Sequence, residues 1–468
     1  MSEFQVVVIG AGPGGYVTAL KLAQLGQSVA LIENDKLGGE CLNYGCIPSK
    51  AMINTSDLYH NMNELAEQGI ELNSSKINLI TFQTWKNSVV KKLRGGIELL
   101  CKNYNVDIIF GRAEIKNMNL VEITQGDKKF EISTENIIIA TGSRAKDLEN
   151  LKFDHKQIVS AKDVLEFDKV PETMLVVGGG AIGLELGTSL AKLGTKVTVV
   201  EIEDKLLPGI EQDLVQVMEK SITSIGVRVM LNSKITDVNK SSLKVVVSIN
   251  NNGEDIVEEF DKILVAVGRQ ANIENLGLDE NKIKVETNGF IQVDESLQTN
   301  IPGIYAIGDV TGPPWLAHKA SMQGIKLAYQ IAKIPTKIQI KNIPYAIYTE
   351  PEIASVGLTE EEANINKLNV SVGKVQLAAN ARALTTNQTK GFAKVIVDKD
   401  THKILGVHIV GNNASNLISE AILGLNIGMS VEDIESTIHP HPTLTEALFE
   451  AAQASLDRSV HTFRKKTS

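Results

Sequence analysis

Two of the three cysteines in this 468-residue chain lie five positions apart, within GGECLNYGCIPSK at residues 38–50. A thiol pair can exchange two electrons with a substrate by forming and breaking a disulfide. On a regular helix the Cα atoms of Cys41 and Cys46 would lie about 8 to 9 Å apart, beyond the roughly 7 Å that a disulfide bridges. If the pair bonds, the backbone must leave helical geometry, which Gly45 best permits. Two small buried thiols are the alternative interpretation.

The sequence after the pair favours a reactive thiol. Pro48 suits the first turn of a helix that continues through SKAMINTSDLYH at residues 49–60. The exposed N–H groups of such a helix start would lower a thiol pKa and stabilise a thiolate.

A second group with acid–base chemistry lies in HPHPTLTE at residues 439–446. Glu446 could hold the imidazole of His441 in the tautomer that accepts a proton. Thr443 and Glu446 also fit a capping box that opens a helix over residues 444–456, and this role is compatible with the first. A metal site at His439 and His441 is the third interpretation, although no other ligand cluster accompanies the two histidines.

The elements that must position these residues include a segment that occurs twice, at residues 6–33 and 174–201. Each copy predicts a strand, a glycine-rich turn, a helix, a second strand and a final glutamate. The glycines allow a tight turn and close approach of the backbone to a pyrophosphate at the helix start, and the glutamate accepts hydrogen bonds from a ribose. The alternative is that each glycine-rich turn only closes a tight corner between a strand and a helix and binds no dinucleotide. The residues concerned are Gly10, Gly12, Gly15 and Glu33 in the first copy and Gly178, Gly180, Gly183 and Glu201 in the second.

Two dinucleotide sites on one chain predict an electron relay in which one dinucleotide is a flavin. Glu201 would repel a 2′-phosphate, and no arginine replaces it in VVEIEDKLLPG at residues 199–209. The sequence therefore favours NAD over NADP.

The composition narrows the class of protein. The net charge is −9 and the one basic run is RKK at residues 464–466, so we expect no nucleic-acid partner. We expect no membrane span and no signal or transit peptide, because no apolar run approaches about 20 residues and a strand pattern begins at Phe4. Three cysteines in so long a chain favour a reducing compartment, either the cytoplasm of a bacterium or archaeon or the mitochondrial matrix.

The cysteine segment and the His–Glu segment resemble the signatures of the flavoprotein disulfide reductases. Four further segments follow in the order of that family, so the similarity extends over essentially the whole chain. They are IIIATGS at residues 137–143, ILVAVGR at 263–269, IYAIGDV at 304–310 and YTEPEIASVGLTEEEA at 348–363. Within the family, CIPSK and the NAD-type Glu201 are most similar to members that oxidise dihydrolipoamide. Glu40 and Tyr44 depart from the small or aliphatic residues more usual there.

The resemblance implies an α/β fold with two Rossmann-like dinucleotide-binding domains, for FAD and NAD, and an α+β C-terminal dimerisation domain. The implied domains are FAD-binding (1–148), NAD-binding (149–271), central, completing the FAD site (272–342), and interface (343–468). The strand patterns at residues 392–398 and 404–411 independently indicate an antiparallel sheet with helices on one side.

The resemblance also implies residue roles. Lys50 lies near the flavin N5 and pairs with Glu185 beside the nicotinamide. The implied FAD site comprises Gly10, Gly12, Gly15, Glu33, Lys50, Ala113, Thr141, Gly142, Ser143, Asp309, Leu316, Ala317 and His318. The implied NAD site comprises Gly178, Gly180, Gly183, Glu185, Glu201 and Gly268, and the implied catalytic residues are Cys41, Cys46, His441 and Glu446.

In the implied mechanism, His441 deprotonates a substrate dithiol, whose thiolate attacks Cys41, the exposed sulfur. Cys46 is released as a thiolate beside the flavin, and the electrons leave through FAD to NAD. His441 serves the disulfide of the other subunit, which requires a homodimer with shared active sites. The implied partners are a lipoyl-bearing acyltransferase of a 2-oxo acid dehydrogenase complex or a glycine cleavage lipoyl protein.

Three alternatives remain. They are another disulfide reductase of this family, a flavin NADH oxidase or diaphorase that would not need both cysteines, and a binding component of a larger complex without turnover. The third cysteine, Cys101, lies in a helix-like stretch and is expected to be a buried bystander.

Overall fold

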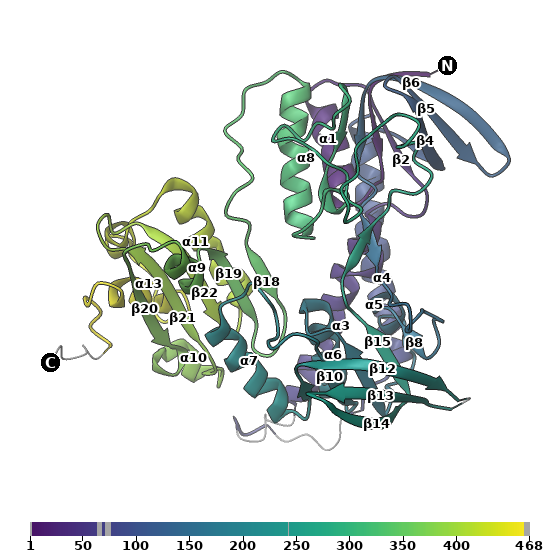
Figure 1. Cartoon of the computed structure of the whole chain (residues 1–468). Coiled ribbons are helices and arrows are strands. Elements are labelled where there is room, and N and C mark those ends of the chain that lie inside the picture. The colour runs from purple at the N-terminus through teal and green to yellow at the C-terminus, as the bar shows by residue number, and fades with distance from the viewer. Residues whose placement is uncertain (1, 63–67, 71–75, 242, 463–468) are drawn as a thin grey trace.

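The computed structural model describes residues 2–62, 68–70, 76–241 and 243–462. Figure 1 shows three groups of elements. The N-terminal group adjoins a teal group, and the C-terminal group, coloured green to yellow, lies beside them. The basic run at residues 464–466 lies outside the described residues. Within the described ranges, the helices include none that is long and apolar enough to cross a membrane.

The central strands of the first sheet are apolar and buried on both faces at residues 6–9, 29–32 and 137–139, as expected for parallel strands covered by helices. Its order is β3-β2-β1-β6-β5-β4, with β17 added in parallel to β6; the pairs β4–β5 and β5–β6 are antiparallel. These strands are β1 (Ser2–Ile9), β2 (Val29–Glu33), β3 (Asp107–Phe110), β4 (Arg112–Asn117), β5 (Leu120–Gln125), β6 (Lys128–Ile139) and β17 (Ile304–Ala306).

Two helices from distant parts of the sequence pack together beside this sheet, α1 (Pro13–Gln24) and α8 (Ala317–Ile331) (Figure 1). A Cβ on Gly324 of α8 would lie 2.0 Å from the Thr18 hydroxyl of α1, so only glycine permits this approach. The short helix η2 (Gly308–Thr311) follows β17, and the Gly308 N–H donates to Gln323 Oε1 of α8. Residues around 304–320 therefore complete the N-terminal group.

The second sheet repeats the start of the first, with parallel order β11-β10-β9-β15-β8. Its strands are β8 (Ile158–Val159), β9 (Thr173–Val177), β10 (Lys196–Val200), β11 (Arg228–Met230) and β15 (Lys262–Val265). Beside it lie α5 (Ala161–Val164), α6 (Ala181–Lys192), α7 (Gln212–Ser224) and an antiparallel sheet of β12 (Ser233–Lys240), β13 (Val245–Asn251) and β14 (Glu254–Phe260). The antiparallel pair β7 (Ser143–Ala145) and β16 (Arg269–Ala271) forms a ribbon between the two groups.

The helix α3 (Cys46–Asn61) connects the two groups. It follows α2 (Gly39–Tyr44), precedes the long helix α4 (Leu79–Asn103), and packs against α6. Met52 of α3 shares a hydrophobic core with Leu184 and Leu186 of α6. This packing sets the helix that begins at Cys46 against the helix that follows the second glycine-rich turn.

The C-terminal sheet is antiparallel, as the sequence predicts, with order β18-β19-β22-β21-β20. Its strands are β18 (Tyr345–Ile347), β19 (Ile353–Gly357), β20 (Val370–Gln376), β21 (Phe392–Asp398) and β22 (Ile404–Val410). The helical segments here are α9 (Glu360–Ile365), η3 (Leu377–Ala379), α10 (Ala381–Thr385), α11 (Ala414–Ile427), α12 (Val431–Glu435) and α13 (Glu446–Ala454).

The expectation that helices cover only one side of this sheet is wrong. Ala393 and Val395 share a core with α11 and α13, but Phe392 and Val410, on the opposite face, share one with α7. The buried Lys394 on that face forms an ion pair of 3.0 Å with Glu211. The sheet is thus covered on its second face by the group that contains the second nucleotide motif.

Candidate redox site

The two cysteines lie on either side of a helix break. Cys41 lies within α2 and Cys46 begins α3, and between them Gly45 adopts φ −132° and ψ −104°. A Cβ at Gly45 would lie 3.3 Å from the carbonyl oxygen of Glu40, so a larger residue would crowd the end of α2. The departure from helical geometry that the sequence predicts is therefore present. Both cysteines are free thiols in this structure.

The two thiols have different acidities because they interact with each other. A hydrogen bond from Cys41, assisted by the charge of Lys50, holds the pKa of Cys46 below its ordinary value. The same hydrogen bond raises the pKa of Cys41, and burial raises it further. The pair therefore favours a Cys41 thiol beside a Cys46 thiolate.

In the single chain Cys41 is half-buried and Cys46 is exposed. The expectation that Cys41 is the exposed sulfur concerns a chain with flavin beside Cys46, and it stays a prediction. Cys101 is buried in α4, and burial raises the pKa of its thiol, which suits a bystander.

Lys50 and Glu185 meet across the contact between α3 and α6. Lys50 Nζ lies 2.7 Å from Glu185 Oε2, and the Glu185 side chain is only 8% exposed. The Tyr348 N–H donates to the other carboxylate oxygen at 3.0 Å, and Lys50 Nζ lies 4.4 Å from the centre of the Tyr348 ring. The C-terminal group thus contributes Tyr348, which is not among the predicted site residues. Its signal in the sequence was its place at the start of the segment at residues 348–363.

The first and last glycines of each nucleotide motif are required by the protein itself. Gly10 and Gly178 have φ of +101° and +109°, and a Cβ on either would lie within 2.5 Å of a carbonyl oxygen. A Cβ on Gly15 or Gly183 would approach the carbonyl oxygen of Gly10 or Gly178 to 1.8 and 2.4 Å.

The middle glycines differ. A Cβ on Gly12 would meet only Gly39 Cα at 4.0 Å, and one on Gly180 would meet no atom within 4 Å. The open space before each helix is what a pyrophosphate needs, so both turns fit a dinucleotide.

The two acids hold matching positions at the ends of their strands. The Ala11 N–H donates to Glu33 at 2.8 Å, and the Gly179 N–H donates to Glu201 at 2.6 Å. Each carboxylate is therefore fixed next to its glycine turn with lone pairs left to accept a ribose hydroxyl.

We expect Gly180→Ala and Gly183→Ala to fail in different ways. Gly180→Ala leaves the fold intact, because its Cβ meets open space, and weakens NADH binding about 10- to 100-fold by crowding the pyrophosphate. Gly183→Ala lowers thermal stability, because its Cβ collides with the backbone of Gly178. Fluorescence titration with NADH and thermal unfolding measure the two effects. Wild-type NADH affinity in a folded Gly180→Ala would contradict the assignment of this turn.

A polar cluster joins the ribbon to η2. Ser143 Oγ donates to Asp309 Oδ2 at 2.6 Å, and Thr141 Oγ1 donates to the Asn272 carbonyl at 2.7 Å. Arg269, only 14% exposed, donates from Nε to Ser143 Oγ at 2.6 Å and lies 2.9 Å from Glu40 Oε2. Arg269 was not among the predicted site residues, although it ends the segment at residues 263–269.

The remaining predicted cofactor residues lie around these elements. Ala113 is buried in β4, two residues after Gly111, whose N–H donates to the Glu33 carbonyl. Gly142 and Gly268 have positive φ at the two ends of the ribbon. Leu316, Ala317 and His318 form the start of α8, and a ring nitrogen of His318 lies 2.9 Å from the Pro344 carbonyl.

His441 and Glu446 form a pair that lies apart from the cysteines. His441 Nδ1 lies 2.9 Å from Glu446 Oε1, and the His441 side chain is 72% exposed. Burial would raise the pKa of Glu446, but hydrogen bonds from Thr443 and His441 lower it below its ordinary value. Figure 1 shows α13 well separated from α3, and among the described residues no hydrogen bond or ion pair joins His441 to either cysteine.

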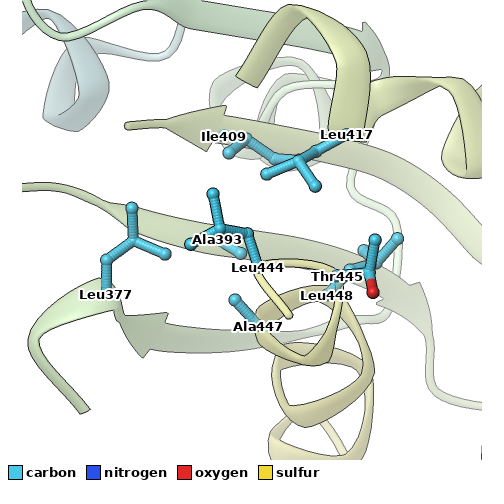
Figure 2. Close-up of a pocket in the computed structure, with 8 residues that line it drawn as sticks. All are labelled: Leu377, Ala393, Ile409, Leu417, Leu444, Thr445, Ala447 and Leu448. Atoms are coloured by element: carbon cyan, nitrogen blue, oxygen red, sulfur yellow. The ribbon is translucent and has the colours of Figure 1, made fainter. Parts of the chain in front are cut away.

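The predicted capping box is only half formed. The Thr443 N–H donates to Glu446 Oε2 at 2.8 Å. In a full capping box the Thr443 hydroxyl would also accept a helix N–H, but here it donates to the Pro440 carbonyl, and α13 begins at Glu446. Figure 2 shows how the start of α13 is anchored, with the side chain of Leu444 beside that of Ala393 and the side chain of Leu448 next to that of Thr445.

His439 is occupied by its own contacts. Its ring nitrogens lie 3.0 Å from Glu420 Oε1 and 3.0 Å from the Thr437 carbonyl, and its ring packs against Phe449. In the part of the chain that the structure describes, no group of three or more His, Cys, Asp or Glu could hold a metal.

Comparison with known proteins places the chain in a family. A family model described as pyridine nucleotide-disulphide oxidoreductase matches residues 4–324, and the dimerisation domain of the same family matches residues 343–452. Dihydrolipoyl dehydrogenase of Geobacillus stearothermophilus is 42% identical over 463 residues, covering 99% of this chain and 98% of that protein. The Haloferax volcanii enzyme of the same name is 40% identical over 466 residues, with 98% of each chain covered.

Solved structures agree in fold. LpdA from Mycobacterium tuberculosis superposes with a TM-score of 0.90 at 26% identity, covering 97% of this chain and 99% of that one. The flavoprotein disulfide reductase RclA from Escherichia coli gives 0.86 at 27% identity, covering 97% and 99%.

These matches confirm the predicted fold class and enzyme class, and the dimerisation domain supports the predicted homodimer. The family uses FAD and NAD, which confirms the two predicted cofactors. The chain belongs to the pyridine nucleotide-disulphide oxidoreductase family.

Proposed function

We propose that this chain oxidises protein-bound dihydrolipoamide to lipoamide and reduces NAD to NADH, with FAD as the intermediate carrier. The observation that carries the proposal is the thiol pair at the Gly45 break with the Lys50–Glu185 ion pair on the adjoining helices. The identity of about 40% with dihydrolipoyl dehydrogenases supports the choice of substrate.

His441 is the proton acceptor in the proposed mechanism. Glu446 occupies Nδ1, which assigns the proton of the neutral ring to Nδ1 and leaves Nε2 free to accept one from a substrate thiol. The resulting thiolate attacks Cys41 Sγ in the oxidised enzyme, the bond between the two cysteines breaks, and Cys46 leaves as a thiolate. The thiol of lower pKa leaves faster, and Cys46 has the lowered pKa, so the attack falls on Cys41.

The second substrate thiol then completes the oxidation. It loses its proton, attacks the sulfur of the substrate that is bonded to Cys41, and closes the lipoamide ring while Cys41 leaves with a proton. Lys50 places a cation beside the Cys46 thiolate, and Glu185 and Tyr348 hold that cation in place. FAD, when bound, accepts the electron pair and passes it on as hydride to NAD.

We infer that His441 serves the cysteines of the other subunit. The separation of α13 from α3, the exposure of His441 and the dimerisation domain support this arrangement. Leu423, Ile427 and Ile438 are also exposed, and a second copy of the chain would cover such apolar side chains.

The finer assignments are proposals of the same kind. The domain boundaries are proposed at 1–148, 149–271, 272–342 and 343–468, supported by β17 of the third segment joining the first sheet. The proposed partner is a lipoyl-bearing acyltransferase or a glycine cleavage lipoyl protein. The proposed compartment is the cytoplasm or the mitochondrial matrix, and one relative is a mitochondrial enzyme from Dictyostelium discoideum, 40% identical over 463 residues.

Assays of the purified protein test the substrate assignment. Dihydrolipoamide with NAD is compared with glutathione disulfide and NADPH, and with NADH and oxygen alone. We expect rapid NAD-dependent oxidation of dihydrolipoamide and little activity with the other pairs, because Glu201 disfavours a 2′-phosphate. A preference for glutathione disulfide and NADPH would identify another reductase of the family, and oxidation of NADH by oxygen alone at a comparable rate would identify an oxidase.

A further inference from the structure

Glu40, the residue before Cys41, forms an ion pair with an arginine from a distant part of the sequence. Glu40 Oε2 lies 2.9 Å from a terminal nitrogen of Arg269, whose side chain is 14% exposed, while that of Glu40 is 39% exposed. Glu40 lies in α2 and Arg269 begins β16. This contact is therefore a direct link between the helix that carries Cys41 and the ribbon between the two nucleotide-binding groups.

Arg269 is also fixed on its other side. Its Nε donates to Ser143 Oγ at 2.6 Å and lies 3.7 Å from Asp309 Oδ2, and a terminal nitrogen donates to the Ser143 carbonyl at 2.9 Å. One guanidinium thus shares its charge between two carboxylates, Glu40 beside the cysteines and Asp309 in the proposed FAD site. Such hydrogen bonds to charged groups hold both partners in defined geometry.

We propose that the Glu40 carboxylate, together with the Arg269 guanidinium that it pairs with, sets how readily the disulfide formed by Cys41 and Cys46 accepts electrons. The proposal rests on the proposed function, because it concerns the redox pair of that same site. Glu40 takes no part in bond making or breaking.

The sign of the effect follows from charge. When NADH reduces the disulfide, the sulfur–sulfur bond receives two electrons and one proton, giving a Cys41 thiol, a Cys46 thiolate and NAD. Reduction therefore adds one negative charge to the cysteine pair, which begins at the residue after Glu40. A carboxylate disfavours that added charge and a guanidinium favours it. Glu40 and Arg269 therefore have opposite effects on the equilibrium between the disulfide and the reduced pair.

Other charged groups besides Arg269 lie near the cysteines and α2. Tyr44 of α2 donates to Asp35 at 2.7 Å, with Lys162 and Lys36 against its ring at 3.8 and 4.9 Å from the ring centre, and Lys50 is paired with Glu185. The variants of Glu40 leave these groups unchanged.

The experiment compares holoenzyme variants at equilibrium with defined ratios of NADH to NAD, using the long-wavelength absorbance of a thiolate beside oxidised flavin as readout. Glu40→Gln keeps the size of the side chain and removes its charge. We expect the equilibrium to shift about tenfold toward the reduced pair, because the variant removes one negative charge from the residue that precedes the cysteine pair. For two electrons this corresponds to about 30 mV. Glu40→Asp, which keeps the charge, should lie close to wild type.

Two controls separate charge from loosening of the fold. Glu274→Gln removes a carboxylate from Arg144 on the same ribbon. Within the described residues Glu274 forms no hydrogen bond or ion pair with α2, so no shift is expected. Tyr44→Phe removes a hydrogen bond of α2 without changing a charge.

Arg269→Gln should shift the equilibrium in the opposite direction, toward the oxidised pair, because it leaves two carboxylates without a compensating charge. In the double variant with Glu40→Gln, the equilibrium should lie between those of Arg269→Gln and the wild type. An unchanged equilibrium in Glu40→Gln, or a shift shared equally by Tyr44→Phe, would overturn the inference. Absence of any two-electron reduced state in the wild type would instead overturn the proposed function.

Discussion

His441→Gln is expected to abolish oxidation of dihydrolipoamide while flavin content and reduction of the flavin by NADH remain close to wild type. Glutamine cannot accept a proton from the substrate thiol, whereas transfer between nicotinamide and flavin takes no proton from this residue. General acid–base groups contribute about 10² to 10⁴ in rate, so dithiol turnover should fall by at least that factor. Steady-state assays with dihydrolipoamide and stopped-flow reduction by NADH measure the two halves separately.

His439→Gln is the matched control, because it changes the neighbouring histidine of the same segment. His439 is held by Glu420 and Phe449 and has no contact with Glu446 like that of His441. We expect its effect to fall on stability rather than on proton transfer. A loss of dithiol turnover in His439→Gln as large as that in His441→Gln would contradict the assignment of the base.

Mixed dimers test whether the site is shared. A dimer of one His441→Gln subunit and one Cys46→Ser subunit holds one intact site if the histidine acts on the other chain. Recovered dithiol activity is the expected result. Stable mixed dimers without activity would place His441 in the same chain as its cysteines, or outside the mechanism.

Replacing either cysteine with serine should abolish dithiol turnover, but the two variants should differ in their long-wavelength absorbance. Both Cys41→Ser and Cys46→Ser lose dithiol turnover by at least about 10³-fold, because neither can form the disulfide. Cys41→Ser retains the Cys46 thiolate and should keep long-wavelength absorbance with oxidised flavin, whereas Cys46→Ser should lose it. The absorbance of the two variants as a function of pH measures this difference. The reverse pattern would exchange the roles of the two sulfurs.

Much of the site could be predicted because its local geometry is encoded in short segments. Gly10 and Gly178 must have positive φ next to a carbonyl, which only glycine tolerates without strain, and the acid that ends each second strand follows at a fixed distance. A break in helical geometry at Gly45 was predicted because two cysteines five positions apart on a regular helix are too far apart to form a disulfide. The contact between His441 and Glu446 was expected from one interpretation of the segment at residues 439–446, in which a carboxylate orients a histidine.

The contacts that could not be predicted join residues far apart in the sequence. Arg269 meets Glu40 across 229 positions of the chain, and Tyr348 meets Glu185 across 163. Lys394 is buried against Glu211, 183 positions earlier, because α7 covers that face of the sheet.

Titration of the purified holoenzyme with dihydrolipoamide, followed by absorbance, tests the two-thiol mechanism most directly. Two electrons per subunit should produce a long-wavelength band, because Cys46 becomes a thiolate beside oxidised flavin with Lys50 near it. Addition of NAD should then remove the band and yield NADH. A flavin that bleaches directly to its fully reduced form, without such a band, would contradict the account.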